Sequence, residues 1–133
     1  MQIDTKPFYV MGIINATPDS FYDGGSYISV DRAFEHAQQL IAEGADILDI
    51  GGASSRPGAA VVEPELERER IVPVIKKIRE VNPGIPVSVD TTWVSVAGAA
   101  VEAGATIIND ISSGRFDKTM SAFIASADVD VIL

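Results

Sequence analysis

Residues 44–49 read Gly-Ala-Asp-Ile-Leu-Asp, and residues 104–109 read Gly-Ala-Thr-Ile-Ile-Asn. In both stretches Gly-Ala closes a segment with helical spacing, a short apolar run follows, and a polar residue ends the run. A weaker copy begins at residue 127, where the chain reads Ala-Asp-Val-Asp-Val-Ile. A sequence motif that recurs in this way indicates repeated β/α units.

Five short apolar runs, rich in Val and Ile, are expected to form strands: residues 9–14, 47–50, 86–89, 106–108 and 129–133. They do not alternate strictly between apolar and polar residues, which is typical of strands buried on both faces of a parallel sheet. The segments between them have apolar residues at helical spacing, so strands and helices are expected to alternate as βαβ units.

The helix ends are also marked in the sequence. Ser29 is a suitable N-cap for the first helix, and Gly104 is expected to end the third. Pro64 suits the first turn of the second helix, whereas Pro73 is expected to kink or divide that helix. The fourth helix is expected to start near Asp117.

The repeated phrase favours a (β/α)8 barrel of the TIM type over an open doubly wound sheet. The pattern alone leaves the competing α/β folds open. A complete barrel of this type typically needs about 250 residues, and this chain has 133. We therefore expect one domain over residues 1–133 that is incomplete at its C-terminal side, with roughly five strands and four helices, or about half a barrel.

The composition excludes several classes of protein. With 10 Lys and Arg residues against 19 Asp and Glu, the net charge of -9 argues against nucleic-acid partners and against anionic membranes. The absence of Cys excludes disulfides, thiolate metal sites and a Cys nucleophile. Because no signal peptide or membrane span is evident, a cytoplasmic protein is expected. The charged run over residues 63–70 is expected to be a solvated helical face.

Small, polar or charged residues follow four of the apolar runs directly. In a (β/α)8 barrel the carboxyl ends of all strands open onto one face, which carries the active site. The barrel interpretation therefore gathers seven polar residues at one mouth: Asn15, Asp49, Ser55, Arg56, Asp90, Asn109 and Asp110.

These phrases resemble the signatures of the dihydropteroate synthases. Residues 11–21, followed by Asp-Gly-Gly at 23–25, resemble the first signature, and residues 44–52 with Ser-Arg-Pro-Gly-Ala at 55–59 resemble the second. Residues 87–91 and 107–111 are similar to the third and fourth strands of that family. The resemblance covers essentially the whole chain, with Ala53 where a Glu is common and Ser55 where a Thr is common.

The resemblance implies an enzyme of folate biosynthesis. Its reaction joins p-aminobenzoate to the methylene carbon of a 6-hydroxymethyl-dihydropterin diphosphate and releases pyrophosphate, with Mg2+ as cofactor. The complete enzyme is expected to be a homodimer. The later strands of the family supply an Asp, a Lys and an Arg-x-His phosphate site, so residues 1–133 alone are expected to be inactive.

The resemblance implies that Asp90 and Asn109 bind the pterin. One carboxylate can accept two hydrogen bonds from an amino-pyrimidine edge, and an amide can both donate and accept. From the residues alone, each has an equally good structural alternative: Asp90 as a helix N-cap and Asn109 as an Asx-turn residue. Asp110, beside Asn109, is expected to be structural.

The second loop, residues 51–58, follows the second apolar run, and Arg56 is its cation. The planar fork of Arg56 suits phosphate or carboxylate. Together with Asp90 it is expected to be catalytic. The resemblance implies that Ser55 binds the diphosphate of the substrate, and that Pro57 and Phe21 form walls of the p-aminobenzoate pocket.

Asn15 is implied to be a Mg2+ ligand, because a neutral carbonyl oxygen is a suitable donor for this ion. Its alternative is turn chemistry before Thr17. Asp23 in the first loop is expected to support the metal or the closed loop; a simple turn residue before Gly24 is an equally good interpretation.

Two other functional classes stay open. The first is a pterin-binding or methyltetrahydrofolate-binding barrel without synthase chemistry, and the second is an inert structural half-barrel that dimerises. Asp90 and Asn109 would serve either kind of pterin protein. The first loop and the loop around Arg56 favour diphosphate chemistry and therefore the synthase.

Overall fold

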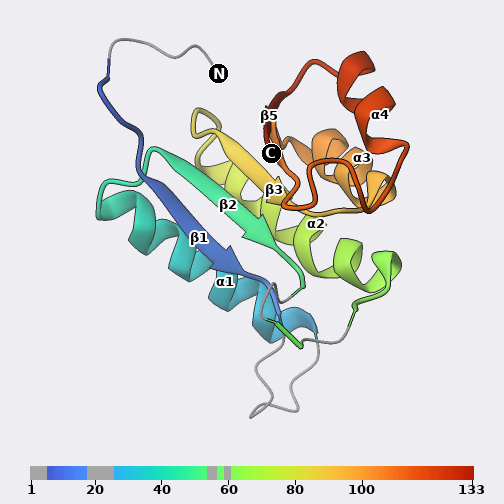
Figure 1. Cartoon of the computed structure of the whole chain (residues 1–133). Coiled ribbons are helices and arrows are strands. Elements are labelled where there is room, and N and C mark those ends of the chain that lie inside the picture. The colour runs from blue at the N-terminus through green and yellow to red at the C-terminus, as the bar shows by residue number, and fades with distance from the viewer. Residues whose placement is uncertain (1–5, 18–25, 54–56, 59–60) are drawn as a thin grey trace.

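The computed structural model describes residues 6–17, 26–53, 57–58 and 61–133, with side chains of the first helix from Val30 onward (Figure 1). Five parallel strands form one sheet in chain order: β1 (Met11–Asn15), β2 (Ile47–Gly51), β3 (Val87–Asp90), β4 (Ile107–Asn109) and β5 (Asp130–Ile132). The helices between them are α1 (Ser26–Ala42), α2 (Pro64–Val81), α3 (Val94–Ala103) and α4 (Met120–Ser126). Successive strands pair in the same way in a (β/α)8 barrel, so the predicted half-barrel of five strands and four helices is confirmed.

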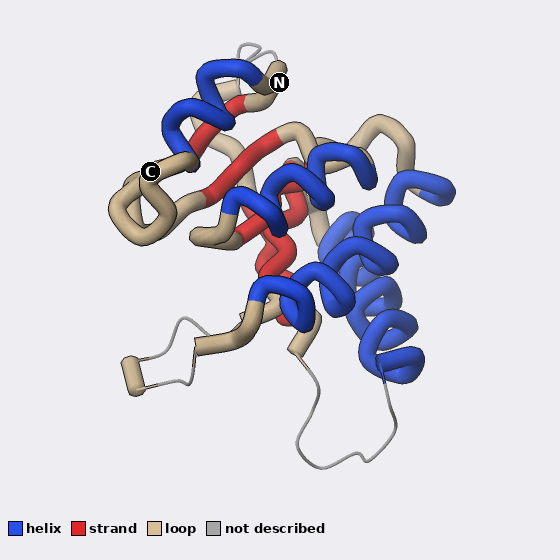
Figure 2. Tube along the Cα trace, turned by 90° about the vertical axis from the view of Figure 1, so that its right-hand side faces the viewer, coloured by secondary structure: helices blue, strands red, loops and turns tan. Residues whose placement is uncertain are grey.

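Helices α1, α2 and α3 lie along one face of the sheet, and α2 packs between the other two (Figures 1 and 2). The layer between sheet and helices is apolar and fully buried, with Ile14, Leu48, Ile50, Val87, Val89 and Ile108 from strands and Ile71, Val74, Ile75, Ile78, Val96, Ala97 and Ala100 from helices. Each large side chain buried here contributes about 1.5–3 kcal/mol. No helix in the described part of the chain has the length and apolar character to cross a membrane.

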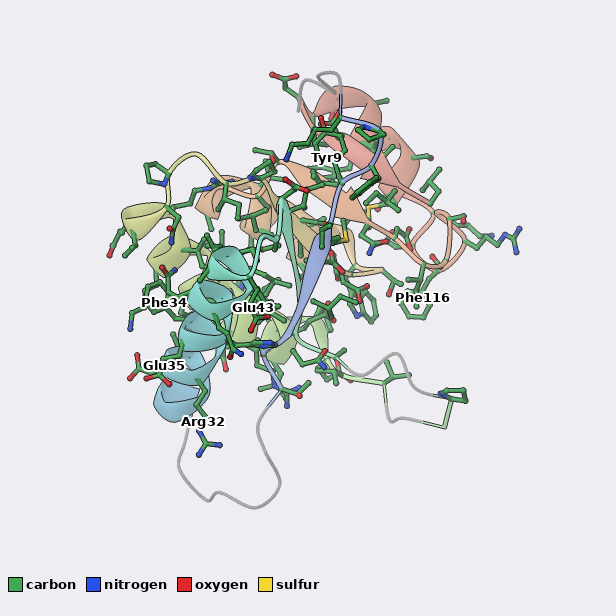
Figure 3. The ribbon with its side chains drawn as sticks, turned by 90° about the vertical axis from the view of Figure 1, so that its left-hand side faces the viewer. Tyr9, Arg32, Phe34, Glu35, Glu43 and Phe116 are labelled. Carbon is green, nitrogen blue, oxygen red and sulfur yellow. The ribbon has the colours of Figure 1, made fainter. Side chains whose placement is uncertain are left out.

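The outer surface of α1 is polar. Arg32 and Glu35 are exposed on it (Figure 3). Lys77 of α2 reaches this helix, where its Nζ lies 2.6 Å from Asp31 Oδ1 and 4.9 Å from the centroid of the Phe34 ring. The two helices are therefore joined at the surface by an ion pair and a cation–π contact above their apolar packing.

The face of the sheet that points away from these helices carries two rows of side chains. Along β1, Gly12 and Ile14 are buried toward the helices, whereas Ile13 and Asn15 are exposed. Residues in register on parallel strands point the same way. The lower row therefore consists of Ile13, Asp49, Ser88, Ile107 and Asp130, and the upper row, at the strand ends, of Asn15, Gly51, Asp90, Asn109 and Ile132.

Two details of the helices differ from the prediction. Helix α1 begins at Ser26, so Ser29 lies inside it and not at its cap. Helix α2 starts at Pro64 as predicted but is not divided at Pro73. A proline in a helix costs about 3 kcal/mol, which the burial of four large side chains on the inner face of α2 more than offsets: Ile71, Val74, Ile75 and Ile78. Gly104 ends α3 as predicted, with a φ of +118° that suits glycine.

Candidate functional site

Asp90 and Asn109 lie side by side at the carboxyl ends of β3 and β4. They are partners in the register of the two strands, and both are partly exposed. Their side chains belong to the upper row, so both point to the side of the sheet that becomes the interior of a closed barrel. The structure thus brings together the two residues expected to bind a pterin.

Asp90 does not cap the helix that follows it. The N-cap residue of α3 is Trp93, whose side chain makes no capping hydrogen bond. The N–H of Val94 instead donates to Asp117 Oδ2 at 3.1 Å. Because a residue from the β4–α4 connection caps α3, the carboxylate of Asp90 is left for another partner.

The Asx-turn after β4 is made by Asp110 and not by its neighbour. Asp110 Oδ1 accepts the N–H of Ser112 at 2.9 Å, and its Oδ2 accepts the N–H of Gly114 at 2.9 Å. Asp110 is fully buried and shapes this loop, in agreement with its expected structural role. Asn109 instead donates from Nδ2 to Asp49 Oδ2 at 3.2 Å.

The carboxyl groups around Asp90 make this end of the sheet strongly acidic. Burial raises the pKa of Asp90 to about 6, and the charges of Asp49, Glu67 and Asp110 add to the effect. The ionised form of a buried carboxylate with three acidic neighbours is stabilised by hydrogen-bond donors that carry no negative charge. A pKa raised by burial and like charge in this way is typical of functional sites.

Glu67 is a buried acid in a segment that the sequence predicts to be solvated. Residues 63–70 were expected to be solvated, but this glutamate is only 3% exposed, so the prediction is wrong at this position. Burial raises the pKa of Glu67, whereas a hydrogen bond with Thr91, just after β3, acts in the opposite direction. The signal for its burial was its position four residues before Ile71, on the buried stripe of α2.

The start of the second loop is held without the glutamate that is common at position 53. The carbonyl of Gly51 accepts the N–H of Ala16 at 2.8 Å, and the carbonyl of Gly52 accepts from Arg70 Nη1 at 2.7 Å. A Cβ added to Gly52 would lie 2.9 Å from the carbonyl oxygen of Glu67. The loop therefore approaches α2 so closely that only glycine fits there without displacement.

Four of the predicted site residues lie outside the described part of the chain: Phe21, Asp23, Ser55 and Arg56. Their expected roles stay predictions. Pro57 is described and is exposed in a turn.

Asn15 is exposed at the end of β1, and Gly51 of β2 separates it from Asp90 in the upper row. Among the described residues there is no group of three or more His, Cys, Asp or Glu side chains that could hold a metal ion. A single neutral amide oxygen suits an ion that keeps water and phosphate oxygens as its other ligands, as Mg2+ does. Asn15 could therefore supply one oxygen ligand to such an ion.

The sequence is similar to known proteins. A family model described as "Pterin binding enzyme" matches residues 11–133. The dihydropteroate synthase of Streptococcus pyogenes is 51% identical over 124 residues, which are 93% of this chain and 46% of the relative. That of Bacillus subtilis is also 51% identical, over 93% of this chain and 43% of the relative. The chain thus spans less than half the length of these relatives.

Solved structures agree with the sequence comparison. A Clostridium difficile dihydropteroate synthase, crystallised in the presence of pteroic acid, superposes with a TM-score of 0.86 at 45% identity, over 92% of this chain and 46% of that one. The Xanthomonas albilineans enzyme with 4-aminobenzoic acid has a TM-score of 0.86 at 46% identity, over 94% of this chain and 45% of that one. Since the family match extends from β1 to the last residue, this chain belongs to the pterin-binding enzyme family.

Proposed function

We propose that residues 1–133 form the pterin-binding half of a dihydropteroate synthase. This enzyme condenses 6-hydroxymethyl-7,8-dihydropterin diphosphate with p-aminobenzoate and releases pyrophosphate. The observation that carries the proposal is the pair of Asp90 and Asn109, side by side at the strand ends on the inner face of the sheet. The structures of relatives involve ligands of the same chemistry, since one was obtained in the presence of pteroic acid and another with 4-aminobenzoic acid.

The charge of the site favours the ring of this substrate over its diphosphate. Asp90 has the carboxyl groups of Asp49, Glu67 and Asp110 as neighbours, so an anion placed there would be repelled. A neutral pterin ring instead offers the N–H donors of its amino-pyrimidine edge, which one carboxylate can accept in pairs. The diphosphate would then lie toward β1 and β2.

The chemistry on that side has to stabilise a leaving group. The bond between the methylene carbon and oxygen breaks, and negative charge gathers on the departing pyrophosphate. Arg56, which follows β2, is proposed to meet this charge, and Ser55 to hold the diphosphate. When bound at Asn15, Mg2+ would supply further neutralising charge.

The second substrate is proposed to enter beside the same loops. Phe21 and Pro57 would form the walls of its pocket, and Asp23 would support the closed first loop. We also propose a homodimer in the cytoplasm as the complete form of the enzyme. The roles of Phe21, Pro57 and Asp23 rest on the resemblance of the first two loops to the family signatures.

The proposal is tested with the longest polypeptide that carries these residues. Dihydropterin diphosphate, p-aminobenzoate and Mg2+ are supplied, and dihydropteroate is measured by chromatography. We expect product formation that needs both substrates. Pterin binding without product would favour a binding barrel that lacks synthase chemistry, and the absence of pterin binding would contradict the proposal.

The 133 residues alone are expected to be inactive and to self-associate. The inner face of the sheet exposes Ile13 by 63%, and Leu133 beyond β5 is 70% exposed. Exposed apolar surface and unpaired strand edges favour association. Sedimentation together with the product assay checks both expectations; a monomer with full turnover would contradict them.

A further inference from the structure

The lower row of the inner face contains two buried polar groups whose hydrogen-bonding capacity is not fully used. Asp49 is 4% exposed and Ser88 is fully buried. Within the part of the chain that the structure describes, Asp49 Oδ1 and Ser88 Oγ have no hydrogen-bond partner. A buried carboxylate with an unpaired oxygen lowers the free energy of unfolding. Its presence is therefore expected to serve a functional purpose. Nothing proposed above gives Asp49 such a purpose.

Within the described residues, the side-chain hydrogen bond of Asp49 leads to the pterin site. Asp49 lies on β2 and Asn109 on β4, so the bond from Asn109 Nδ2 to Asp49 Oδ2, at 3.2 Å, passes over the inner face of β3. Ser88 of β3 is in register with Asp49. Its small side chain leaves room for the bridge, and the curvature of a barrel sheet makes inward-pointing side chains converge.

The chemistry of this bond fixes the rotation of the Asn109 amide. An ionised carboxylate has acceptor atoms only, so the NH2 group of an amide must face it. The opposite rotation would place two oxygen acceptors against each other. We propose that Asp49 is a positioning residue for the pterin site, which holds Asn109 Nδ2 toward the lower row and leaves Asn109 Oδ1 free to accept a hydrogen bond from the ring.

The inference rests on the proposed pterin site and adds to it a reason for its selectivity. With the amide fixed, Asn109 presents an acceptor beside the acceptor Asp90, so the two residues together select a ligand edge that carries donors. A free amide would present either atom. Asp49 itself lies two residues deeper along the strands than Asp90, at about 3.3 Å per residue, and acts through Asn109.

Asp49→Asn tests this role, because it keeps the size of the side chain but can donate as well as accept. The ligand is 6-hydroxymethylpterin, titrated into the longest polypeptide that carries these residues. We expect the Kd of Asp49→Asn to rise on the order of tenfold, the loss expected for a misplaced hydrogen bond. Ser88→Ala is the matched control from the same row, and its Kd should equal that of the parent.

A second readout separates positioning from simple stability. Asp49 is one of three acids that raise the pKa of Asp90, with Glu67 from α2 and Asp110 after β4. Removal of its charge should move the acidic limb of pterin binding to lower pH, which a purely structural defect would not do. In the NMR spectrum of the parent, one Asn109 side-chain N–H should be shifted downfield and protected from exchange.

The outcomes separate this inference from the proposed function. A parent that binds no pterin overturns both. A parent that binds, with an Asp49→Asn variant of unchanged Kd and unchanged pH limb, overturns the positioning role alone. If the variant does not fold, the Asn109 amide signal of the parent decides: two rapidly exchanging, unshifted N–H signals would overturn the inference.

Discussion

The two ends of the sheet use charge in opposite ways. At the end where the strands begin, Asp46 pairs with Lys6 and accepts the N–H of Val10 at 2.9 Å. These bonds lower the pKa of Asp46. Arg79 donates from Nε to the carbonyl of Gly104 at 2.8 Å and so ties the end of α2 to the turn before β4. The charged groups named here all have partners within the chain.

At the end where the strands finish, the charges are crowded and only partly paired. Burial raises the pKa of both Asp90 and Glu67, and Asp49 Oδ1 has no partner among the described residues. Such an arrangement weakens the folded state. The difference shows that one end of the half-barrel stabilises the fold, while the other is arranged for a ligand, as in barrel enzymes generally.

The largest effect is expected at Asp90. Asp90→Ala removes the acceptor for two ring donors, each worth about 1.5–3 kcal/mol as a hydrogen bond to a charged group. The affinity for 6-hydroxymethylpterin should therefore fall by about 100-fold or more, measured by titration calorimetry. Asp46→Ala at the opposite end is the matched control, and it should leave the affinity unchanged. Equal losses in the two variants would remove the distinction between the ends.

A loss of stability without a loss of affinity is expected at Arg79. Its guanidinium also donates to the carbonyls of Pro83 and Ile85. Arg79→Met keeps the apolar stem but removes these bonds, so the free energy of unfolding should fall by about 2–3 kcal/mol, measured by urea denaturation. Arg68→Met removes only an exposed ion pair with Glu65 and should cost less than about 0.5 kcal/mol. A weaker pterin affinity in Arg79→Met would contradict the structural role of this end.

A smaller loss is expected from Gly52→Ala. The added Cβ would lie 2.9 Å from the Glu67 carbonyl oxygen and 3.0 Å from Ile71 Cγ2, so the second loop or α2 must shift. We expect a loss of about 1–2 kcal/mol of stability and a weaker affinity for the diphosphate substrate. Gly84→Ala, where the added Cβ would meet no atom within 4 Å, is the control and should be close to neutral. An unchanged free energy of unfolding in Gly52→Ala would contradict the close approach of the second loop to α2.

The smallest effect is expected in the pH dependence of stability and of pterin affinity. The folded-state pKa of Asp90 is raised to about 6, so the folded state holds a proton that the unfolded state has already lost. Stability should therefore decrease as the pH rises from about 4 to about 6, while pterin affinity should decrease as the pH falls through about 6. Asp90→Asn should remove this contribution to stability. Parallel curves for the variant and the parent, from unfolding at a series of pH values, would contradict the assignment.

The fold could be predicted largely because its signals are local. The Gly-Ala phrase before β2 and β4 marks where a helix ends and a buried strand begins, and Gly104 has the positive φ that this turn requires. Pro73 does not divide α2, because the burial along the helix offsets the cost of a helical proline and the sequence shows only the cost. The start of α1 was misplaced at Ser29, since a capping residue inside a helix looks the same in sequence as one at its end.

The site could be predicted only in part, for a different reason. Asp90 and Asn109 were recognisable because each directly follows an apolar run, and the structure makes each the last residue of its strand. The bond of Asn109 to Asp49 joins residues 60 positions apart on strands that are not neighbours, and no local pattern indicates it. Glu67 was hidden in a charged run, where only its helical spacing to Ile71 separates it from exposed neighbours.

The most direct test of the acidic end as the ligand site is a crystal structure with bound 6-hydroxymethylpterin. We expect the amino-pyrimidine edge to lie within about 3.2 Å of Asp90, with a ring donor on Asn109 Oδ1. A ring bound elsewhere would contradict the account, for example in the surface groove between α2 and α3 that Arg68, Lys76 and Glu102 line. So would a complex in which Asp90 contacts only groups of the protein.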